Sequence, residues 1–311
     1  MKKIINIFLL GLITVGFSSC LKDKSLTQPD ADGAIPNLIE FQNIGPITSP
    51  TTSIYPVYLQ SFAVAPTGTL DVVVNYAGVN NAPNDINVTV ALDPTIITKY
   101  NAKIVADARA AAIVLGQDPD DAEADVEGDL FEALDANLYT VGNLNLVIPS
   151  GQRTATLAIG LKPDMFDFAK NTALAFKIVS VSGSSAPISG NFGNIIVKIG
   201  AKNRIDGLYN LKTTAGTSLV PNANKNDVPL VTASARTVTT NLLDTYANIV
   251  TYDIDPVTNK VTVLSVVNPL GVIATDPSSN YNPATKVMYV KWTSNGGGRT
   301  FEETYTFQGA R

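Results

Sequence analysis

Cys20 is the residue with the clearest chemistry near the start of the chain, and it is the only cysteine in the sequence. Ser18 and Ser19 precede it, and small residues before a cysteine give a lipoprotein signal peptidase access to the backbone. Leu or a similar aliphatic residue is usual at the place of Phe17, which is a departure from the pattern. The alternative is an ordinary secretory signal with an incidental cysteine. We expect acylation of the thiol, because a lone free thiol is awkward in an oxidising compartment.

The segments on both sides of Cys20 fit this interpretation. Residues 1–19 have a positive start and an apolar run with the length of a signal-peptide core. Residues 20–36 are polar and rich in Asp, Pro and Gly, which predicts a flexible tether behind the lipidated cysteine. Two or three acyl chains hold a protein stably at a membrane. We therefore expect a protein anchored by lipid to the outer membrane and exposed at the cell surface.

The sequence contains no histidine, and this count excludes many kinds of site. Ser-His-Asp and Cys-His catalysis need histidine, and zinc needs Cys or His ligands in nearly every known form. Carboxylate chemistry survives, chiefly glycoside hydrolysis, and so does calcium bound by oxygen. Glu302 and Glu303 are neighbours on an expected strand, so they point to opposite faces and cannot act as a pair. We expect no cofactor, no metal and no catalytic residue.

An acidic segment is the candidate for calcium. Nine acidic residues and no basic residue lie between Asp118 and Asp135. Their spacing does not match an EF-hand loop, which has a central Gly and a closing Glu. A solvated acidic face is the favoured interpretation, and calcium binding stays open as the alternative.

Aromatic residues of the second half could bind a glycan, because the C–H face of a sugar is apolar and stacks on exposed rings. Tyr246, Tyr252, Tyr281 and Trp292 are the candidates, and we place Tyr246, Tyr281 and Trp292 in a glycan-binding set. Tyr281 lies in a polar segment that reads as a loop and is expected to be exposed. Trp292 has the strand parity of Val290, which favours the core.

Charge and length bound the remaining classes. Without the signal peptide the chain carries 20 basic and 27 acidic residues, which disfavours nucleic-acid binding. About 275 residues follow the tether, which suggests two domains, at 37–203 and 206–311.

The first domain shows the period-two alternation of strands that bury one face. Eight short segments with Gly, Pro and Asn between them predict an antiparallel, immunoglobulin-like β-sandwich. The expected strands are 36–43, 55–64, 70–77, 86–93, 139–148, 154–161, 174–181 and 195–201.

A helical insertion of about 94–137 interrupts these strands. Asp93-Pro94 is a good helix start, and apolar residues then recur at steps of three and four as far as Leu115. Val126, Leu130, Leu134 and Leu138 repeat every four residues, which predicts a second helix with an acidic outer face.

The second domain restarts at Asp206-Gly207 and reads as a second all-β sandwich. Asp255-Pro256 and Asn282-Pro283 each begin a type I turn before a strand. The Gly run at 296–298 is not followed by the helix and Lys-Ser/Thr that a phosphate loop needs, so it predicts a turn. The expected fold class is all-β, with two tandem immunoglobulin-like sandwiches and helices only in the first.

Three segments resemble a known family. They are VTVALDPTIITKYNA at 88–102, LYTVGNLNLVIPSGQRTATLAIGL at 138–161 and the stretch 186–191. They are similar to the N-terminal domain of unknown function at the front of many Bacteroidota surface lipoproteins, which occurs in starch-utilisation-like polysaccharide-uptake loci. The enlarged region 103–137 departs from that family. The second domain resembles more loosely the C-terminal β domains of the same group.

The resemblance implies a surface β-sandwich and brings no catalytic residue with it. We therefore expect a non-catalytic lipoprotein that binds glycans or assists a polysaccharide-uptake complex. Its expected partners are the outer membrane, a polysaccharide and a TonB-dependent transporter, and not nucleic acid. Two other functions stay open. One is a structural or adhesion protein of the surface, and the other is a glycosidase that uses two carboxylates.

Overall fold

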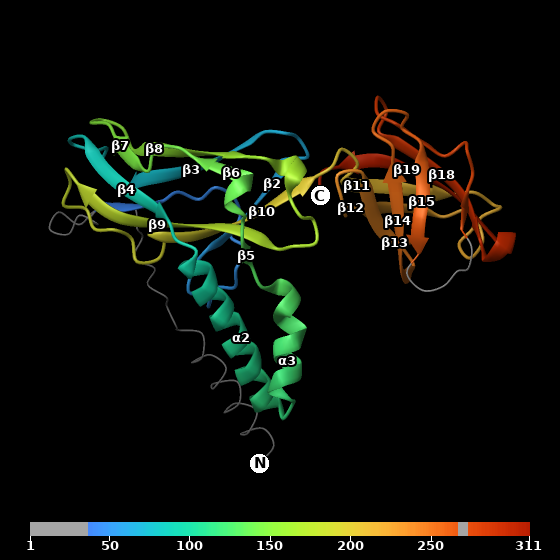
Figure 1. Ribbon diagram of the computed structural model, residues 1–311, viewed down its shortest axis with the longest axis horizontal. Helices are drawn as coiled ribbons and strands as arrows, with labels where there is room; N and C mark the ends of the chain where they lie inside the picture. The colour runs from blue at the N-terminus through green and yellow to red at the C-terminus, as the bar shows by residue number, and fades with distance from the viewer. Residues whose placement is uncertain (1–36, 267–272) are drawn as a thin grey trace, which may run out of the picture.

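The chain forms two β domains joined by a short link at 203–206 (Figure 1). The computed structural model describes residues 37–266 and 273–311. Cys20, the expected signal peptide and the expected tether lie outside the described residues. The all-β class is confirmed, and the two α-helices of the described residues belong to the first domain.

The first domain is a sandwich of a four-stranded and a six-stranded sheet. The first sheet has the order β1 (Leu38–Phe41), β3 (Gly68–Ala77), β8 (Thr154–Leu161) and β6 (Tyr139–Val141). The second has the order β2 (Val57–Ala63), β10 (Asn194–Lys202), β9 (Thr172–Ser182), β4 (Ile86–Leu92) and β7 (Asn145–Ile148), and β5 (Glu132–Ala133) adds to β9. Seven of the eight expected strand segments form strands within the described residues, but 139–148 is divided into β6 and β7, which belong to different sheets. The expected antiparallel pairing is wrong at β2 and β5, which run parallel to β10 and β9.

Alternation along the strands explains why the two sheets pack. In β3, Leu70, Val72 and Val74 are buried between the sheets, while the residues between them are half-buried or exposed. Phe41 and Phe176 meet edge to face across the core, with ring centroids 6.4 Å apart. The period of two read from the sequence is therefore the period of burial.

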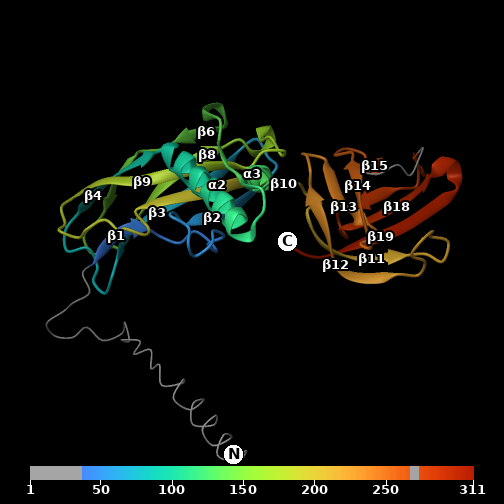
Figure 2. The same ribbon diagram turned by 90° about the horizontal axis from the view of Figure 1, so that it is seen from below.

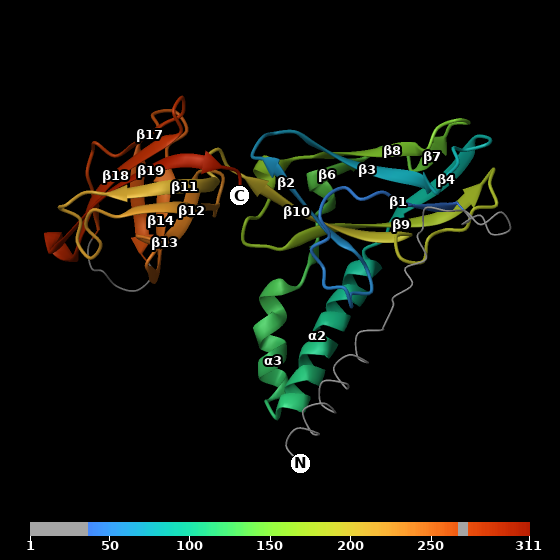
Figure 3. The same ribbon diagram turned by 180° about the vertical axis from the view of Figure 1, so that it is seen from behind.

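Helix α2 (Thr95–Leu115) begins where the sequence predicts and projects away from the sandwich (Figures 1 and 3). Its first turns cover the outer face of the six-stranded sheet, where Ile96, Ile97 and Tyr100 are buried (Figure 2). The expected apolar face is wrong at the far end, because Leu115 is exposed. The helix ends at Gly116, which has the left-handed conformation that glycine adopts easily. No helix in 37–266 or 273–311 has the length and apolarity needed to cross a membrane.

The expected second helix is wrong beyond Val126. Helix α3 (Pro119–Val126) is followed by the single 3-10 turns η1 (Glu127–Asp129) and η2 (Ala136–Leu138), on either side of β5. Asn101 explains part of the difference, because its side chain both donates to the Phe131 carbonyl (2.7 Å) and accepts from the Phe131 amide (3.0 Å). The chain then extends so that Leu134 enters the sandwich core. Tertiary contacts thus override the four-residue repeat.

The second domain is a single nine-stranded antiparallel sheet that curves into a near-barrel. Its order is β15 (Val261–Val266), β14 (Tyr246–Ile254), β13 (Thr237–Leu242), β12 (Asn224–Thr232), β11 (Gly207–Thr213), β19 (Arg299–Gly309), β18 (Val287–Ser294) and β16 (Ala274–Thr275), and β17 (Asn280–Asn282) also pairs with β18. The ends of the order approach each other, because the Val261 amide donates to the Ser279 carbonyl (3.2 Å). The second domain is therefore all-β as predicted, but it is one curved sheet around one core instead of the expected sandwich of two sheets.

The predicted turns form as their residues dictate. Asp255 accepts hydrogen bonds from the amides of Val257 (2.9 Å) and Thr258 (2.7 Å), between β14 and β15. Asn282 accepts from the Ala284 amide (3.0 Å) between β17 and β18. The Gly run at 296–298 closes the β18–β19 hairpin through the 3-10 turn η4 (Asn295–Gly297).

Asp206 ties the end of the chain to the link between the domains. Its buried carboxylate accepts from the amide and the hydroxyl of Thr232 (both 2.8 Å) and pairs with Arg311 (3.2 Å). Burial raises the pKa of Asp206, but the hydrogen bonds from Thr232 and Arg311 outweigh it and hold the pKa below its usual value. Lys202 donates to the backbone carbonyl of Arg311 (2.6 Å).

Gly207 is required by a close approach rather than by its dihedral angles. A methyl group added there would lie 2.6 Å from Cε2 of Phe307 and 2.9 Å from the backbone oxygen of Gly309. We expect Gly207→Ala to lower the free energy of unfolding of the second domain by about 1–3 kcal/mol, as overpacking does. Gly309→Ala is the control, because Gly309 lies in the same domain and nothing lies within 4 Å of its added methyl. Equal melting temperatures for the two variants would contradict the prediction.

Candidate functional site at the domain junction

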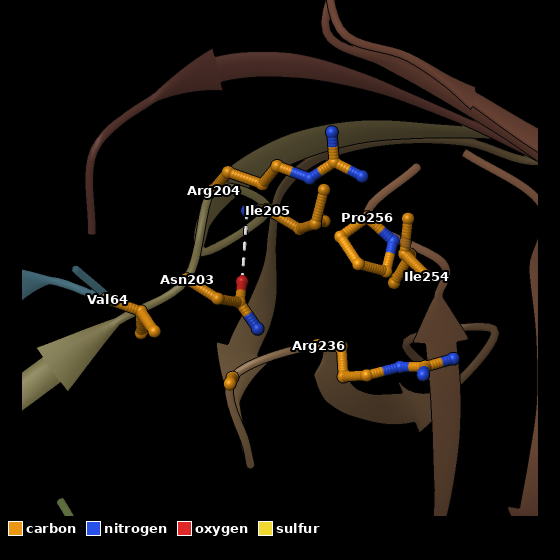
Figure 4. Close-up of a pocket in the computed structure, with 8 residues that line it drawn as sticks. Val64, Asn203, Arg204, Ile205, Arg236, Ile254 and Pro256 are labelled. Atoms are coloured by element: carbon orange, nitrogen blue, oxygen red, sulfur yellow. Dashed lines mark hydrogen bonds between the residues drawn. The ribbon is translucent and has the colours of Figure 1, made fainter. Parts of the chain in front are cut away.

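A cavity of about 320 Å³ opens where the two domains meet (Figure 4). Val64, just after β2, comes from the first domain, and the link between the domains supplies a second wall. The turns at the ends of β12 and β14 supply the rest. The lining residues are Val64, Asn203, Arg204, Ile205, Ala235, Arg236, Ile254 and Pro256. Ligand sites are common at domain interfaces, and this volume is within the range for small-molecule pockets.

Asn203 fixes the wall of this cavity. Its side-chain nitrogen donates to the carbonyls of Ser234 (3.0 Å) and Thr237 (2.8 Å). Its side-chain oxygen accepts from the Ile205 amide (3.0 Å), which is the dashed line in Figure 4. Because both ends of the amide are occupied, Asn203 positions the link and its neighbouring arginine rather than contacting a ligand.

The two arginines differ in how fully they are engaged. Arg236 makes a two-pronged pair with Asp253, at 2.7 Å and 2.5 Å, and these hydrogen bonds raise the pKa of Arg236. Arg204 is exposed, donates to the Asp255 carbonyl (3.2 Å) and lies 5.4 Å from the ring centroid of Tyr281. A guanidinium carries five N–H donors in a rigid fork. Arg204 therefore has donors to spare for a ligand.

Apolar surface lies between these charged groups. Figure 4 shows Arg204 and Arg236 extending along opposite sides of the cavity, with Ile205, Ile254 and Pro256 between them. A few polar groups around an apolar floor are typical of small-molecule sites. The arrangement suits a ligand that has both C–H surface and hydrogen-bonding oxygens.

The structure does not bring the predicted aromatic set together as an exposed surface. The expectation that Tyr281 is exposed is wrong: it lies on β17, and 4% of it is exposed, beneath Arg204. Trp292 is 0% exposed and stacks on Phe301, with centroids 4.1 Å apart, so its predicted core position is confirmed. A buried ring offers no face to a sugar. Tyr246 is half-buried against the barrel core, and a glycan contact there stays a prediction.

Glu303 is a carboxylate whose burial was not predicted from the sequence. It is 0% exposed inside the barrel and accepts hydrogen bonds from Tyr252 (2.8 Å), Tyr305 (2.6 Å) and the Trp292 indole (2.8 Å). Burial raises the pKa of Glu303, against the lowering effect of these donors. The strand alternation of Phe301, Glu303 and Tyr305 is the sequence signal for its burial. Glu302 lies on the opposite face, as predicted, and accepts from Tyr289 (2.9 Å).

The acidic segment uses several of its carboxylates for local structure. Asp118 accepts from the Asp120 amide at the start of α3 (2.9 Å), and Asp135 accepts from the Asn137 amide (2.9 Å). Arg109 pairs with Asp120 and Glu123, each at 2.7 Å. Across the described ranges no three acidic residues converge as a metal site would require. A solvated acidic face is the interpretation that these contacts support.

Two protein families match the chain, one in each domain. Residues 46–185 match a family described as “-like, N-terminal domain”, and residues 207–309 match the domain of unknown function DUF7015. A search of curated proteins found no match.

Solved structures from Bacteroides are similar to this chain. A protein of unknown function from Bacteroides ovatus has a TM-score of 0.52 at 11% identity, over 88% of this chain and 95% of that chain. An auxiliary nutrient binding protein from Bacteroides thetaiotaomicron has a TM-score of 0.45 at 13% identity, over 86% and 93%. A candidate carbohydrate binding protein from Bacteroides ovatus has a TM-score of 0.35 at 13% identity, over 86% and 79%. The likeness to the first of these structures, at 11% identity, concerns the fold alone.

The first match ends at residue 185 and the second begins at residue 207, so the link at 203–206 lies between them. Each match therefore falls within one of the two β domains of the structure. The first domain is therefore similar to the first of these families, and the second domain is similar to DUF7015.

Proposed function

We propose that this chain is a non-catalytic binding protein of a nutrient-uptake system, anchored to the outer membrane by lipid on Cys20, which holds a glycan in the junction cavity. The observation that carries the proposal is the cavity itself, in which the exposed guanidinium of Arg204 stands beside apolar side chains. The Bacteroides protein named as an auxiliary nutrient binding protein belongs to the same functional class.

The chemistry of a sugar matches this cavity. A sugar ring has an apolar C–H face and an edge of hydroxyl groups. Ile205, Ile254 and Pro256 can cover the face, and the unused N–H groups of Arg204 can donate to the hydroxyl oxygens. Uronic acids would add a charge-assisted hydrogen bond to the same guanidinium.

The carboxylates near the cavity do not favour hydrolysis. A glycosidase needs one carboxyl group with a raised pKa, which protonates the leaving oxygen, and a second that is ionised. Hydrogen bonds from Thr258 and Val257 lower the pKa of Asp255, and Asp253 is held by Arg236. Burial raises the pKa of Glu303, but this residue is sealed inside the barrel and out of reach of the cavity.

Arg204→Ala tests the cavity. We expect the variant to bind a retained polysaccharide about 10- to 100-fold more weakly, because a hydrogen bond to a charged group contributes about 1.5–3 kcal/mol. Affinity electrophoresis of the mature protein through gels that contain a panel of polysaccharides measures the effect. Arg299→Ala is the matched control, because Arg299 begins β19 at the end of the barrel away from the junction.

Each result of this experiment assigns a function. Retention by the wild type and by Arg299→Ala, with loss in Arg204→Ala, supports the cavity. Equal retention by all three proteins would mean that the glycan binds outside the cavity. Tyr246 is then the next residue to replace. No retention on any polysaccharide favours a structural or adhesion protein, the second candidate function.

A further inference from the structure

The far end of the helical hairpin formed by α2 and α3 exposes a patch of large aliphatic side chains. Ile113, Val114 and Leu115 are consecutive, and 66%, 85% and 70% of their surfaces are exposed. Three consecutive residues cover most of the circumference of a helix, so the end of α2 is apolar on nearly every side. Isolated exposed apolar residues are ordinary, but a contiguous patch indicates a site of interaction.

The hairpin holds this patch away from the body of the protein. Helix α2 has 21 residues and is therefore about 32 Å long, and its contacts with the sandwich lie in its first turns. Figures 1 and 3 show the end of the hairpin standing clear of both sheets. Neither β domain of the same chain covers Ile113, Val114 and Leu115.

Specific contacts fix the shape of the hairpin end. Arg109 of α2 binds Asp120 and Glu123 of α3, and Ala112 is buried between the helices. The amide of Gln117 donates to the Ala112 carbonyl (2.9 Å), which closes the end of α2. A patch that is ordered before binding loses little conformational entropy when it docks.

The surroundings of the patch are strongly acidic. Residues 105–130 contain eight acidic residues and one basic residue, Arg109. Asp121 and Asp125 are exposed and pair with no lysine or arginine of the described chain. An anionic lipid surface would repel this rim, whereas a basic protein surface would attract it.

We propose that the hairpin end docks into an apolar pocket ringed by lysine or arginine side chains on a partner protein. Val114 and Leu115 enter the pocket, and the acidic rim faces the basic ring. An apolar anchor inside a charged rim is the usual anatomy of a protein–protein contact. This interaction is separate from the junction cavity and does not depend on glycan binding.

Photocrosslinking in cells tests the proposal with the full chain. A benzophenone amino acid at position 114 is expected to crosslink to one protein, which is identified by mass spectrometry together with the crosslinked peptide. The same amino acid at position 257 is the matched control, because Val257 is also 85% exposed but lies alone in the β14–β15 turn. We expect no specific product from position 257.

Reconstitution with the purified partner completes the test. We expect Leu115→Ser to raise the dissociation constant of the complex with the partner at least about tenfold. We expect the same of the double variant Asp121→Lys with Asp125→Lys. We also expect affinity to fall as salt rises. Because Leu115, Asp121 and Asp125 are exposed, we expect these variants to fold like the wild type. The proposal is overturned by crosslinks only to lipid or to a second copy, by a partner with an acidic contact surface, by equal products from both positions, or by no product.

Discussion

Replacing Glu303 by alanine is expected to lower the free energy of unfolding of the second domain by about 3–5 kcal/mol. The change removes the acceptor of three buried donors, from Tyr252, Trp292 and Tyr305. The two tyrosine hydroxyls lie 3.2 Å apart and can satisfy each other only in part. Because a domain of this size is stable by about 5–15 kcal/mol, the loss approaches the whole of its stability.

Denaturant titration followed by tryptophan fluorescence measures the unfolding of the second domain. Trp292 is the only tryptophan of the chain and touches Glu303 directly, so its emission reports on the barrel. Glu303→Gln is the matched variant, because an amide keeps an acceptor for the indole and can donate to the tyrosine oxygens. We expect Glu303→Gln to retain most of the stability that alanine removes. Equal unfolding midpoints for wild type and Glu303→Ala would contradict the structural role.

The stability of the wild type, compared with that of Glu303→Gln, is expected to depend on pH. Burial raises the pKa of Glu303 in the folded protein, so the folded state holds this proton at pH values where the unfolded state has lost it. The contribution of Glu303 to stability therefore falls as pH rises from about 4.3, the ordinary pKa of a glutamate, through its raised folded value. Subtracting the stability-against-pH curve of Glu303→Gln from that of the wild type removes the contributions of other titrating groups. One of these is Asp206, whose lowered pKa makes stability rise with pH.

Replacing Cys20 by serine is expected to abolish membrane attachment. Serine has no thiol to acylate, and two or three acyl chains are what hold a protein stably at a bilayer. Intact mass measurement of the wild type is expected to show an amino terminus at residue 20 that carries lipid. In detergent phase partitioning, we expect the wild type in the detergent phase.

Phe17→Leu is the control for this experiment, because it restores the aliphatic residue usual at that position and keeps Cys20. We expect it to be processed and acylated like the wild type. A wild-type protein with an unmodified amino end, or one recovered from the aqueous phase, would contradict the anchor.

Local patterns predicted most of the fold because they act over a few residues. The alternation of β3 and β8 matches the burial of their side chains, and Asp93-Pro94 begins α2 where a helix start was expected. Asp255 accepts the amide hydrogen bonds that a turn-forming residue needs. Each of these features follows from the preferences of its own residues.

Long-range contacts account for the errors. Leu134 lies four residues after Leu130, which suggested a helix, yet it is buried in a sandwich core that only distant strands create. Tyr281 reads as a loop residue until β18 pairs with its short strand. The curvature of the second domain likewise depends on contacts between β15 and residues near Ser279, which no local pattern records.

The candidate site was missed for a related reason. Arg204 and Arg236 lie 32 positions apart, and only the path of the chain through the junction brings them to one cavity. The position of Arg204 in the link between two domains is the signal that the sequence offered, because ligand sites favour such interfaces. An isolated arginine carries no spacing that marks it as functional.

The proposed function is binding without bond cleavage in the junction cavity. The direct test is to incubate the mature protein with a polysaccharide that it retains, and to measure reducing ends together with the affinity of wild type and Arg204→Ala. We predict no new reducing ends and an affinity that is at least about tenfold lower in Arg204→Ala. New reducing ends formed by the wild type would contradict binding without cleavage. An affinity that Arg204→Ala leaves unchanged would contradict binding in the junction cavity.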